Sequence, residues 1–145
     1  MDEAFTHLLR VRYSECDAQK VVFNAKFVEY IDVAVTEFMR CIWGGYNALL
    51  ESGFDNQVVG LNINWKSPAR FDDVLAIRIH TTTIGTTSFK LQVEFSNHNS
   101  AVAIASADIT YVLVSAATYH KAPIPEALKV ALMQGAKGVI SNHAG

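Results

Sequence analysis

The chain has 145 residues, of which 50% are hydrophobic and 18% are charged, a composition typical of one globular domain and not of a disordered chain. Its 12 Lys and Arg residues and 14 Asp and Glu residues give a formal charge of −2, and the absence of a basic cluster argues against a nucleic-acid partner. No apolar run predicts a membrane span, residues 1–15 do not resemble a signal peptide, and two cysteines form no disulfide framework, so we expect a cytoplasmic protein.

The first predicted elements are a short strand, a loop and the clearest helix of the chain. Thr6–Tyr13 is expected to be the strand, whereas Ser14–Phe23 has no regular period and is expected to be the loop. The helix is predicted to begin at Asn24, as its N-cap, and to stop at Gly44 and Gly45 after about five turns. The apolar residues at helical spacing are Phe27, Tyr30, Ile31, Ala34, Phe38 and Ile42.

From Gln57 onward the apolar period changes to two, which predicts strands with one buried face. Four such strands follow one another and are separated by Pro68, by Gly85 and by the polar turn 97–100. Short turns between alternating strands are typical of an antiparallel meander. The residues expected to face inward are Val59, Leu61, Ile63, Trp65, Leu75, Ile77, Ile79, Phe89, Leu91, Val93, Phe95, Ala103, Ala105, Ala107, Ile109, Tyr111 and Leu113.

The end of the chain predicts a second helix, Glu126–Gln134, and a flexible tail over residues 136–145. A long apolar helix and a large sheet bury their apolar faces when the sheet curls around the helix. The predicted fold class is therefore α+β, with a long central helix wrapped by a curved antiparallel sheet of about five strands. We expect a single domain spanning residues 1–145.

Two segments resemble landmarks of a known family. The stretch from Asp17 to Phe27, DAQKVVFNAKF, resembles the signature of the 4-hydroxybenzoyl-CoA thioesterase family of hotdog proteins, in which an Asp and a short turn precede the long helix. The stretch from Trp65 to Asp73, WKSPARFDD, resembles the family's second landmark, a Pro-x-Arg-x-x-Asp sequence before the third strand. Because helix, meander and spacing follow in the family's order, the resemblance covers nearly the whole chain and implies a hotdog fold.

The resemblance implies an acyl-CoA thioesterase with Asp17 as its catalytic carboxylate, acting as nucleophile or as general base. Thioester hydrolysis also needs hydrogen-bond donors for the oxyanion, and a helix N-terminus presents unpaired N–H groups. We therefore expect the backbone N–H groups of Asn24 and Ala25 to polarise the thioester carbonyl. Basic side chains are candidates to meet the phosphates of CoA. The residues expected to bind substrate are Val22, Phe23, Lys66, Ser67, Arg70 and Lys90.

Two residues depart from the family pattern. Lys20 and Asp72 stand where the family commonly has Gly or another small residue. If the loop requires a positive φ, that conformation is costly for lysine. The Lys20 ammonium could interact with Asp17, meet a CoA phosphate or simply be solvated. Glu29 and Glu37 are also considered, because some hotdog thioesterases carry their carboxylate on the long helix.

Two alternative functions stay open at this point. One is a non-catalytic acyl-thioester-binding hotdog protein, and the other is a hotdog hydratase or dehydratase, which needs a His beside an acid. The Asp17 segment contains no His, and the five histidines form no pair with metal-ligand spacing, so we expect no metal and no cofactor. The expected substrate is an acyl thioester of CoA or of acyl carrier protein. The resemblance, together with the apolar composition, predicts a homodimer or homotetramer.

Overall fold

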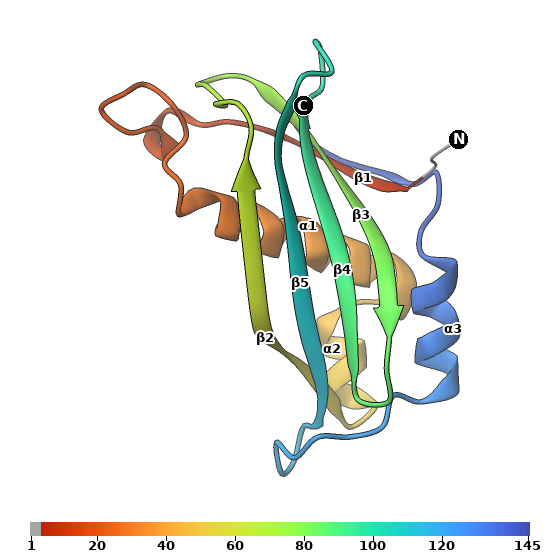
Figure 1. Cartoon of the computed structure of the whole chain (residues 1–145). Coiled ribbons are helices and arrows are strands. Elements are labelled where there is room, and N and C mark those ends of the chain that lie inside the picture. The colour runs from red at the N-terminus through yellow and green to blue at the C-terminus, as the bar shows by residue number, and fades with distance from the viewer. Residues whose placement is uncertain (1–3) are drawn as a thin grey trace.

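The computed structural model describes residues 4–145, and in it one long helix lies against a large sheet (Figure 1). The first three residues of the N-terminal segment considered above lie outside this range. No helix of the described range is long and apolar enough to cross a membrane. In chain order the elements are β1 (Phe5–Arg10), the 3₁₀ turn η1 (Tyr13–Glu15), α1 (Lys26–Trp43), α2 (Tyr46–Glu51), β2 (Phe54–Trp65), β3 (Val74–Ile84), β4 (Ser88–Asn97), β5 (Ala103–Ser115), α3 (Glu126–Gln134) and β6 (Ile140–His143).

Helix α1 forms where the apolar residues recur at helical spacing, and it ends where the sequence predicts. Gly44 terminates it with a φ of 81°, which glycine adopts without strain. The predicted Asn24 cap is wrong, because Ala25 occupies the N-cap position and no side chain caps the helix. The chain enters α1 through a turn, in which the Lys26 N–H donates to the Phe23 carbonyl at 2.9 Å. The residues that α1 buries are Phe27, Tyr30, Ile31, Ala34, Val35, Phe38 and Met39.

The six strands form one sheet in the order β2-β5-β4-β3-β1-β6, antiparallel except for the parallel pair β1 and β6. Strands β3, β4 and β5 form the predicted meander. The prediction that β2 belongs to this meander is wrong. β2 does not pair with β3, the strand that follows it in the sequence, but with β5, the last strand of the meander. The segment 66–73 therefore crosses from one side of the sheet to the other, and this crossing brings it beside the loop that contains Asp17.

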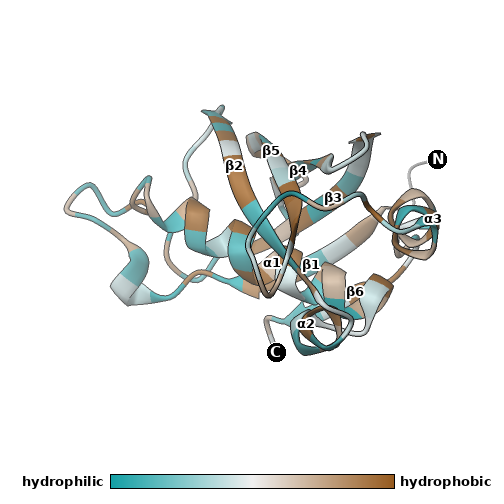
Figure 2. Ribbon diagram, turned by 90° about the horizontal axis from the view of Figure 1, so that it is seen from below, coloured by the Kyte–Doolittle hydropathy of each residue, from teal (hydrophilic) through white to brown (hydrophobic). Residues whose placement is uncertain are grey.

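Aromatic side chains fix α1 against the sheet. The Phe27 ring lies edge-on to Phe95 of β4 at 5.2 Å and to Trp65 of β2 at 5.9 Å, and Phe38 meets Phe5 of β1 at 5.5 Å. In Figure 2, hydrophobic and hydrophilic segments alternate along the strands and around α1, as expected for elements with one buried face. Because burying one such ring stabilises the fold by roughly 1.5–3 kcal/mol, these contacts hold α1 in a fixed place against the sheet.

Strand β2 departs from the predicted burial. Val59, Leu61 and Trp65 were expected to face inward, yet they are 61%, 40% and 45% exposed, respectively. The physical reason is that β2 is an edge strand, so among residues 4–145 it has a neighbouring strand, β5, on one side only. An edge strand with exposed apolar side chains is a candidate contact surface between copies of the chain.

Two further elements differ from the sequence prediction. Helix α2 was not predicted; it begins directly after Gly45, whose φ of 108° allows the sharp change of direction after α1. Residues 136–145, expected to be a flexible tail, contain β6, and Thr6 of β1 pairs with Ile140 of β6. The pairing provides the backbone of this short segment with hydrogen-bond partners, which the sequence pattern did not predict.

Candidate functional site

Asp17 begins a tight turn in the loop between η1 and α1. The Asp17 N–H donates to the Val21 carbonyl and the Lys20 N–H donates to the Asp17 carbonyl, both at 2.9 Å. Cys16 and Val22 form an antiparallel bridge at the base of this turn. One residue further out, the Phe23 N–H donates to the Glu15 carbonyl at 3.0 Å. Asp17 is two residues from Glu15, so its backbone lies within about 7 Å of Glu15, whose partner Phe23 is three residues before α1 begins at Lys26.

The Asp17 carboxylate uses one oxygen to hold the turn and leaves the other available. Oδ1 accepts the Gln19 N–H at 2.8 Å, whereas Oδ2 has no hydrogen-bond partner among residues 4–145. The half-buried side chain lines a pocket of about 420 Å³. The other residues that line the pocket are Tyr13, Ser14, Cys16, Lys20 and Phe71. A carboxylate with one fixed and one free oxygen can accept a proton from water or attack a carbonyl carbon.

Cys16 is the other potential nucleophile of this pocket. Burial and the neighbouring carboxylates of Asp17 and Glu15 raise the pKa of the Cys16 thiol. Because the thiolate is the reactive form of cysteine, this environment keeps Cys16 unreactive at neutral pH. Asp17 is therefore the better candidate for the chemistry.

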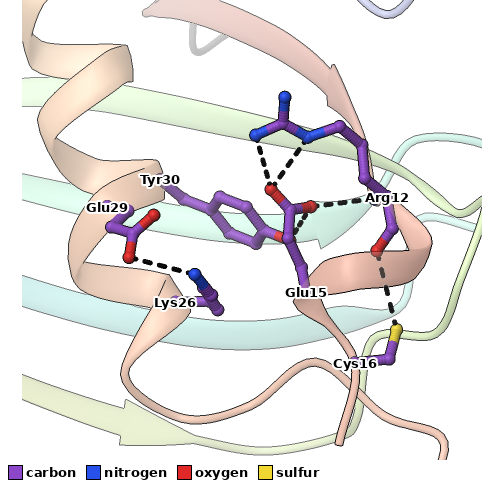
Figure 3. A network of polar contacts seen from close by, with 6 residues as sticks. All are labelled: Arg12, Glu15, Cys16, Lys26, Glu29 and Tyr30. Atoms are coloured by element: carbon purple, nitrogen blue, oxygen red, sulfur yellow. Dashed lines mark hydrogen bonds and ion pairs between the residues drawn. The ribbon is translucent and has the colours of Figure 1, made fainter.

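Glu15 forms a buried network that joins the loop to α1 (Figure 3). Its Oε1 accepts the Tyr30 hydroxyl and the Arg12 N–H, both at 2.8 Å, and its Oε2 accepts Nη2 of the Arg12 guanidinium at 2.9 Å. Glu15 is only 6% exposed. Because Tyr30 lies on the second turn of α1, the network fixes the loop two residues before Asp17 to the helix.

The charges of this network are consistent with its hydrogen bonds. Burial alone would raise the pKa of Glu15, but hydrogen bonds from the Arg12 backbone, the Tyr30 hydroxyl and the Arg12 guanidinium hold that pKa below its usual value. Burial and the hydrogen bond to Glu15 raise the pKa of Tyr30. Glu15 therefore stays ionised and Tyr30 stays a donor at neutral pH, so the anchor remains intact.

The two residues directly before α1 have unpaired backbone donors. Among residues 4–145, the N–H groups of Asn24 and Ala25 donate to no protein acceptor, and both residues are exposed. Such groups at a helix N-terminus carry a partial positive charge and bind anions. They are available to a ligand that approaches the N-terminal end of α1.

The remaining residues expected to bind substrate lie in three places. The Val22 N–H donates to the Ala69 carbonyl at 2.8 Å, so the segment with Ser67 and Arg70 runs beside the Asp17 loop. Val22 itself is buried in the core, whereas Phe23 is half exposed next to the beginning of α1. Lys66 follows β2 and is exposed, and the Ser67 hydroxyl donates to a backbone carbonyl of β5.

Lys90 is not brought to the other predicted residues. It pairs with Thr83, the tenth residue of β3, and so lies at the far end of that strand from the Asp17 loop, roughly 30 Å away at about 3.3 Å per residue. The two helical carboxylates are engaged elsewhere. Glu29 forms an ion pair with Lys26 at 3.2 Å and Glu37 forms one with Arg40 at 3.3 Å.

His7 lies in a separate buried cluster. It is fully buried on β1, its Nδ1 is 3.1 Å from the Ser141 hydroxyl and its ring is edge-on to His143 at 4.5 Å. Burial, and then the nearby His143, lower the pKa of His7 to about 4. No His is among the described residues that line the Asp17 pocket, so a His and an acid are not brought together there. Within residues 4–145 no group of three or more His, Cys, Asp or Glu side chains could hold a metal ion.

Sequence reasoning missed three residues of this site. Tyr13 and Phe71 come from different segments, and their rings meet edge-on at 5.8 Å beside Asp17. A large aromatic residue in an otherwise polar loop is the signal that could have found them. Glu15 was missed because a glutamate in a loop is usually solvated, and the spacing to Tyr30 carries no periodic signal.

Comparisons with known proteins agree with one another. The profile of the Thioesterase-like superfamily matches residues 11–132. The acyl-CoA thioester hydrolase YbgC of Escherichia coli O6:H1 is 26% identical over 120 residues, which are 83% of this chain and 89% of that protein.

Solved structures show the same fold. The structure of Slr0204, a 1,4-dihydroxy-2-naphthoyl-CoA thioesterase from Synechocystis, is similar with a TM-score of 0.80 and 23% identity, covering 89% of this chain and 95% of that one. A thioesterase superfamily protein from Jannaschia sp. CCS1 reaches a TM-score of 0.85 at 23% identity, covering 93% of this chain and 94% of that one.

Proposed function

Because the chain belongs to the Thioesterase-like superfamily, we propose that it is an acyl-CoA thioesterase that hydrolyses a small or medium acyl-CoA to the free acid and CoA. The observation that carries the proposal is the Asp17 carboxylate, which lines a pocket and whose Oδ2 is unpaired among residues 4–145; the unpaired N–H groups of Asn24 and Ala25 follow in the same loop, directly before α1. The similarity to the acyl-CoA thioester hydrolase YbgC supports the same reaction.

The proposed reaction divides the work between Asp17 and the helix. The thioester carbonyl oxygen accepts hydrogen bonds from the Asn24 and Ala25 N–H groups, which stabilise the negative charge that develops on it. Asp17 removes a proton from the attacking water, or attacks the carbonyl carbon itself and is regenerated by water. In both routes a carbon–oxygen bond forms, the carbon–sulfur bond breaks, and the thiolate leaves and is protonated.

We also propose that the chain pairs with a second copy through β2. The support is the row of exposed apolar side chains on this edge strand, which includes Val58, Val59 and Leu61. Trp65, at the end of β2, contacts Phe27 in the first turn of α1. A partner on β2 would therefore lie near the beginning of α1, and the acyl group would be held between the two copies.

Thiol release from a panel of aliphatic and aromatic acyl-CoAs tests the proposed reaction. We expect the wild type to hydrolyse at least one of them, and Asp17→Asn to lower the rate by about 10³-fold, the loss typical of removing a general base. Asp108→Asn removes an exposed carboxylate on β5 and serves as the matched control that keeps its rate. A wild type that binds acyl-CoA without hydrolysing any member of the panel would instead support the non-catalytic alternative.

A further inference from the structure

The backbone of Lys20 is held in a conformation that lysine rarely adopts. Its φ is 67°, in the left-handed region where the side chain of an L-residue crowds the backbone and where glycine is favoured. The turn imposes this conformation, because the Asp17 carbonyl accepts the Lys20 N–H and the Val21 carbonyl accepts the Asp17 N–H. A lysine at such a position points to a role for its side chain, since glycine would form the turn at lower cost.

The Lys20 ammonium has no partner within the protein. Among residues 4–145 it makes no ion pair and no hydrogen bond, although carboxylates lie in the same loop. Two cations near this loop differ from Lys20, since Arg12 is paired with Glu15 and Lys26 with Glu29. The charge of Lys20 is therefore available to a ligand.

The pocket gives this charge a defined location. Lys20 lines the same cavity of about 420 Å³ as Asp17, and of the six residues that line it, all within the described range, Lys20 alone is cationic. Tyr13 and Phe71, which are 80% and 55% exposed, provide two ring surfaces in this pocket. Lys20 is exposed as well, so its ammonium is accessible to a ligand from the solvent.

We infer that Lys20 determines specificity for the thiol half of the substrate by binding one of its phosphates. The inference rests on the proposed thioesterase function and deepens it. The phosphates carry the negative charge of the thiol half. A flexible ammonium binds a phosphate as a point charge, without fixed geometry. Two sources supply such a phosphate, the nucleotide end of CoA and the phosphopantetheine of an acyl carrier protein.

Three substitutions separate the charge of Lys20 from its backbone conformation. Lys20→Asn removes the charge and keeps a residue that tolerates positive φ, Lys20→Gly removes both the charge and the strain, and Lys20→Arg keeps the charge. Ala101→Gly is the matched backbone control, because Ala101 has a φ of 62° in a turn on another part of the chain. Lys129→Asn, on α3, is the matched control for charge.

The experiment measures KM for one acyl group carried by three thiols, CoA, 4′-phosphopantetheine and pantetheine, together with the Kd of free CoA by calorimetry. We expect Lys20→Asn and Lys20→Gly to raise the KM and the Kd for CoA about tenfold, with Lys20→Arg and both controls close to wild type. The pantetheine thioester, which has no phosphate, should show no such change. An effect that persists with phosphopantetheine assigns Lys20 to that phosphate, and an effect confined to CoA assigns it to the nucleotide end.

Two results would overturn the inference. One is a Lys20→Asn variant that binds CoA as tightly as the wild type, and the other is an equal rise in KM for the pantetheine thioester, which would mean that Lys20 acts only on the shape of the turn. Failure of the proposed function is a separate outcome. A wild type that hydrolyses no thioester but binds CoA in a Lys20-dependent way would contradict catalysis and still support the phosphate contact.

Discussion

Glu15 and Asp17 are carboxylates separated by a single residue, and they have opposite environments. Glu15 is buried, and both of its oxygens accept hydrogen bonds from Arg12 or Tyr30. Asp17 is half exposed, and one of its oxygens has no partner among residues 4–145. The difference indicates a division of roles, in which a fully paired carboxylate fixes the loop and a half-paired one remains available for chemistry.

This division follows from the cost of burying charge. An ionised group away from water must be paired, and once it is paired it has little capacity left for a substrate. A group that is to react needs an unpaired atom near a cavity, and the turn from Asp17 to Val21 provides one. If the two carboxylates have separate roles, their replacements should have separate effects on stability and on activity.

Replacement of the buried carboxylate should weaken the fold. Glu15→Ala leaves the Tyr30 hydroxyl and the Arg12 N–H without acceptors and opens space beside α1, so we expect a loss of about 3 kcal/mol in the free energy of unfolding. Urea denaturation followed by circular dichroism measures the loss. Glu51→Ala, an exposed glutamate on α2, is the control that should stay within about 0.5 kcal/mol of wild type. A Glu15→Ala variant as stable as this control would contradict the anchoring role.

Acid should act on the buried groups in two separate pH ranges. The pKa of His7 is about 4 in the folded protein against an ordinary 6.5, so the unfolded chain binds the proton first and stability falls as pH drops from 6.5 towards 4, by up to about 3 kcal/mol. The pKa of Glu15 is also lowered, and its contribution is lost only below its ordinary value of 4.5. In His7→Phe, the fall in stability over the upper pH range should disappear. In Glu15→Gln, the fall over the lower pH range should disappear. Curves that keep both ranges in these variants would contradict the assignment.

The hydroxyl of Tyr30 should account for part of the Glu15 anchor. Tyr30→Phe keeps the ring in the core and removes a 2.8 Å hydrogen bond to a buried carboxylate, which should cost about 2 kcal/mol of folding free energy. Thermal unfolding at neutral pH measures it. Tyr46→Phe also removes a hydroxyl bonded to a carboxylate, that of Asp55, but on the surface. Equal losses in both variants would show that burial of the Glu15 network adds nothing.

The smallest effect concerns the exposed end of the Asp17 turn. Lys20→Gly removes the strain of a positive φ, and part of the gain is offset by the greater freedom of glycine in the unfolded chain, so we expect stabilisation by about 0.5 to 1 kcal/mol. Ala101→Gly should give a similar gain for the same reason. Denaturant midpoints of the two variants measure it, and destabilisation by Lys20→Gly would show that the lysine side chain supports the turn through contacts of its own.

Periodic patterns predicted the helices and strands whose apolar residues pack within the chain. The helix Glu126–Gln134 forms as expected, and α1 ends at Gly44, because apolar spacing and glycine are local signals. The pairing of β6 with β1 joins Ile140 to Thr6 across most of the sequence, and four residues are too few to carry a period. The exposed side chains of β2, such as Val59, were assigned inward because alternation marks an apolar face without saying what covers it.

The candidate site was only partly readable for a related reason. Asp17 and the beginning of α1 are close in sequence, so the motif named both as candidates, and both stay predictions. Phe71 reaches the same pocket only because the segment after β2 crosses the sheet, and the role of Glu15 depends on a tyrosine on the helix. Such contacts between distant segments depend on topology, and neither spacing nor composition encodes them.

The central claim is that Asp17 performs the chemistry while Glu15 maintains the structure, and one paired measurement on Asp17→Asn tests it. The value of kcat/KM for the best acyl-CoA and the free energy of unfolding are determined on the same preparation. The account predicts a fall in kcat/KM of about 10³-fold with stability within about 0.5 kcal/mol of wild type. A folded Asp17→Asn enzyme that turns over acyl-CoA at the wild-type rate would contradict it.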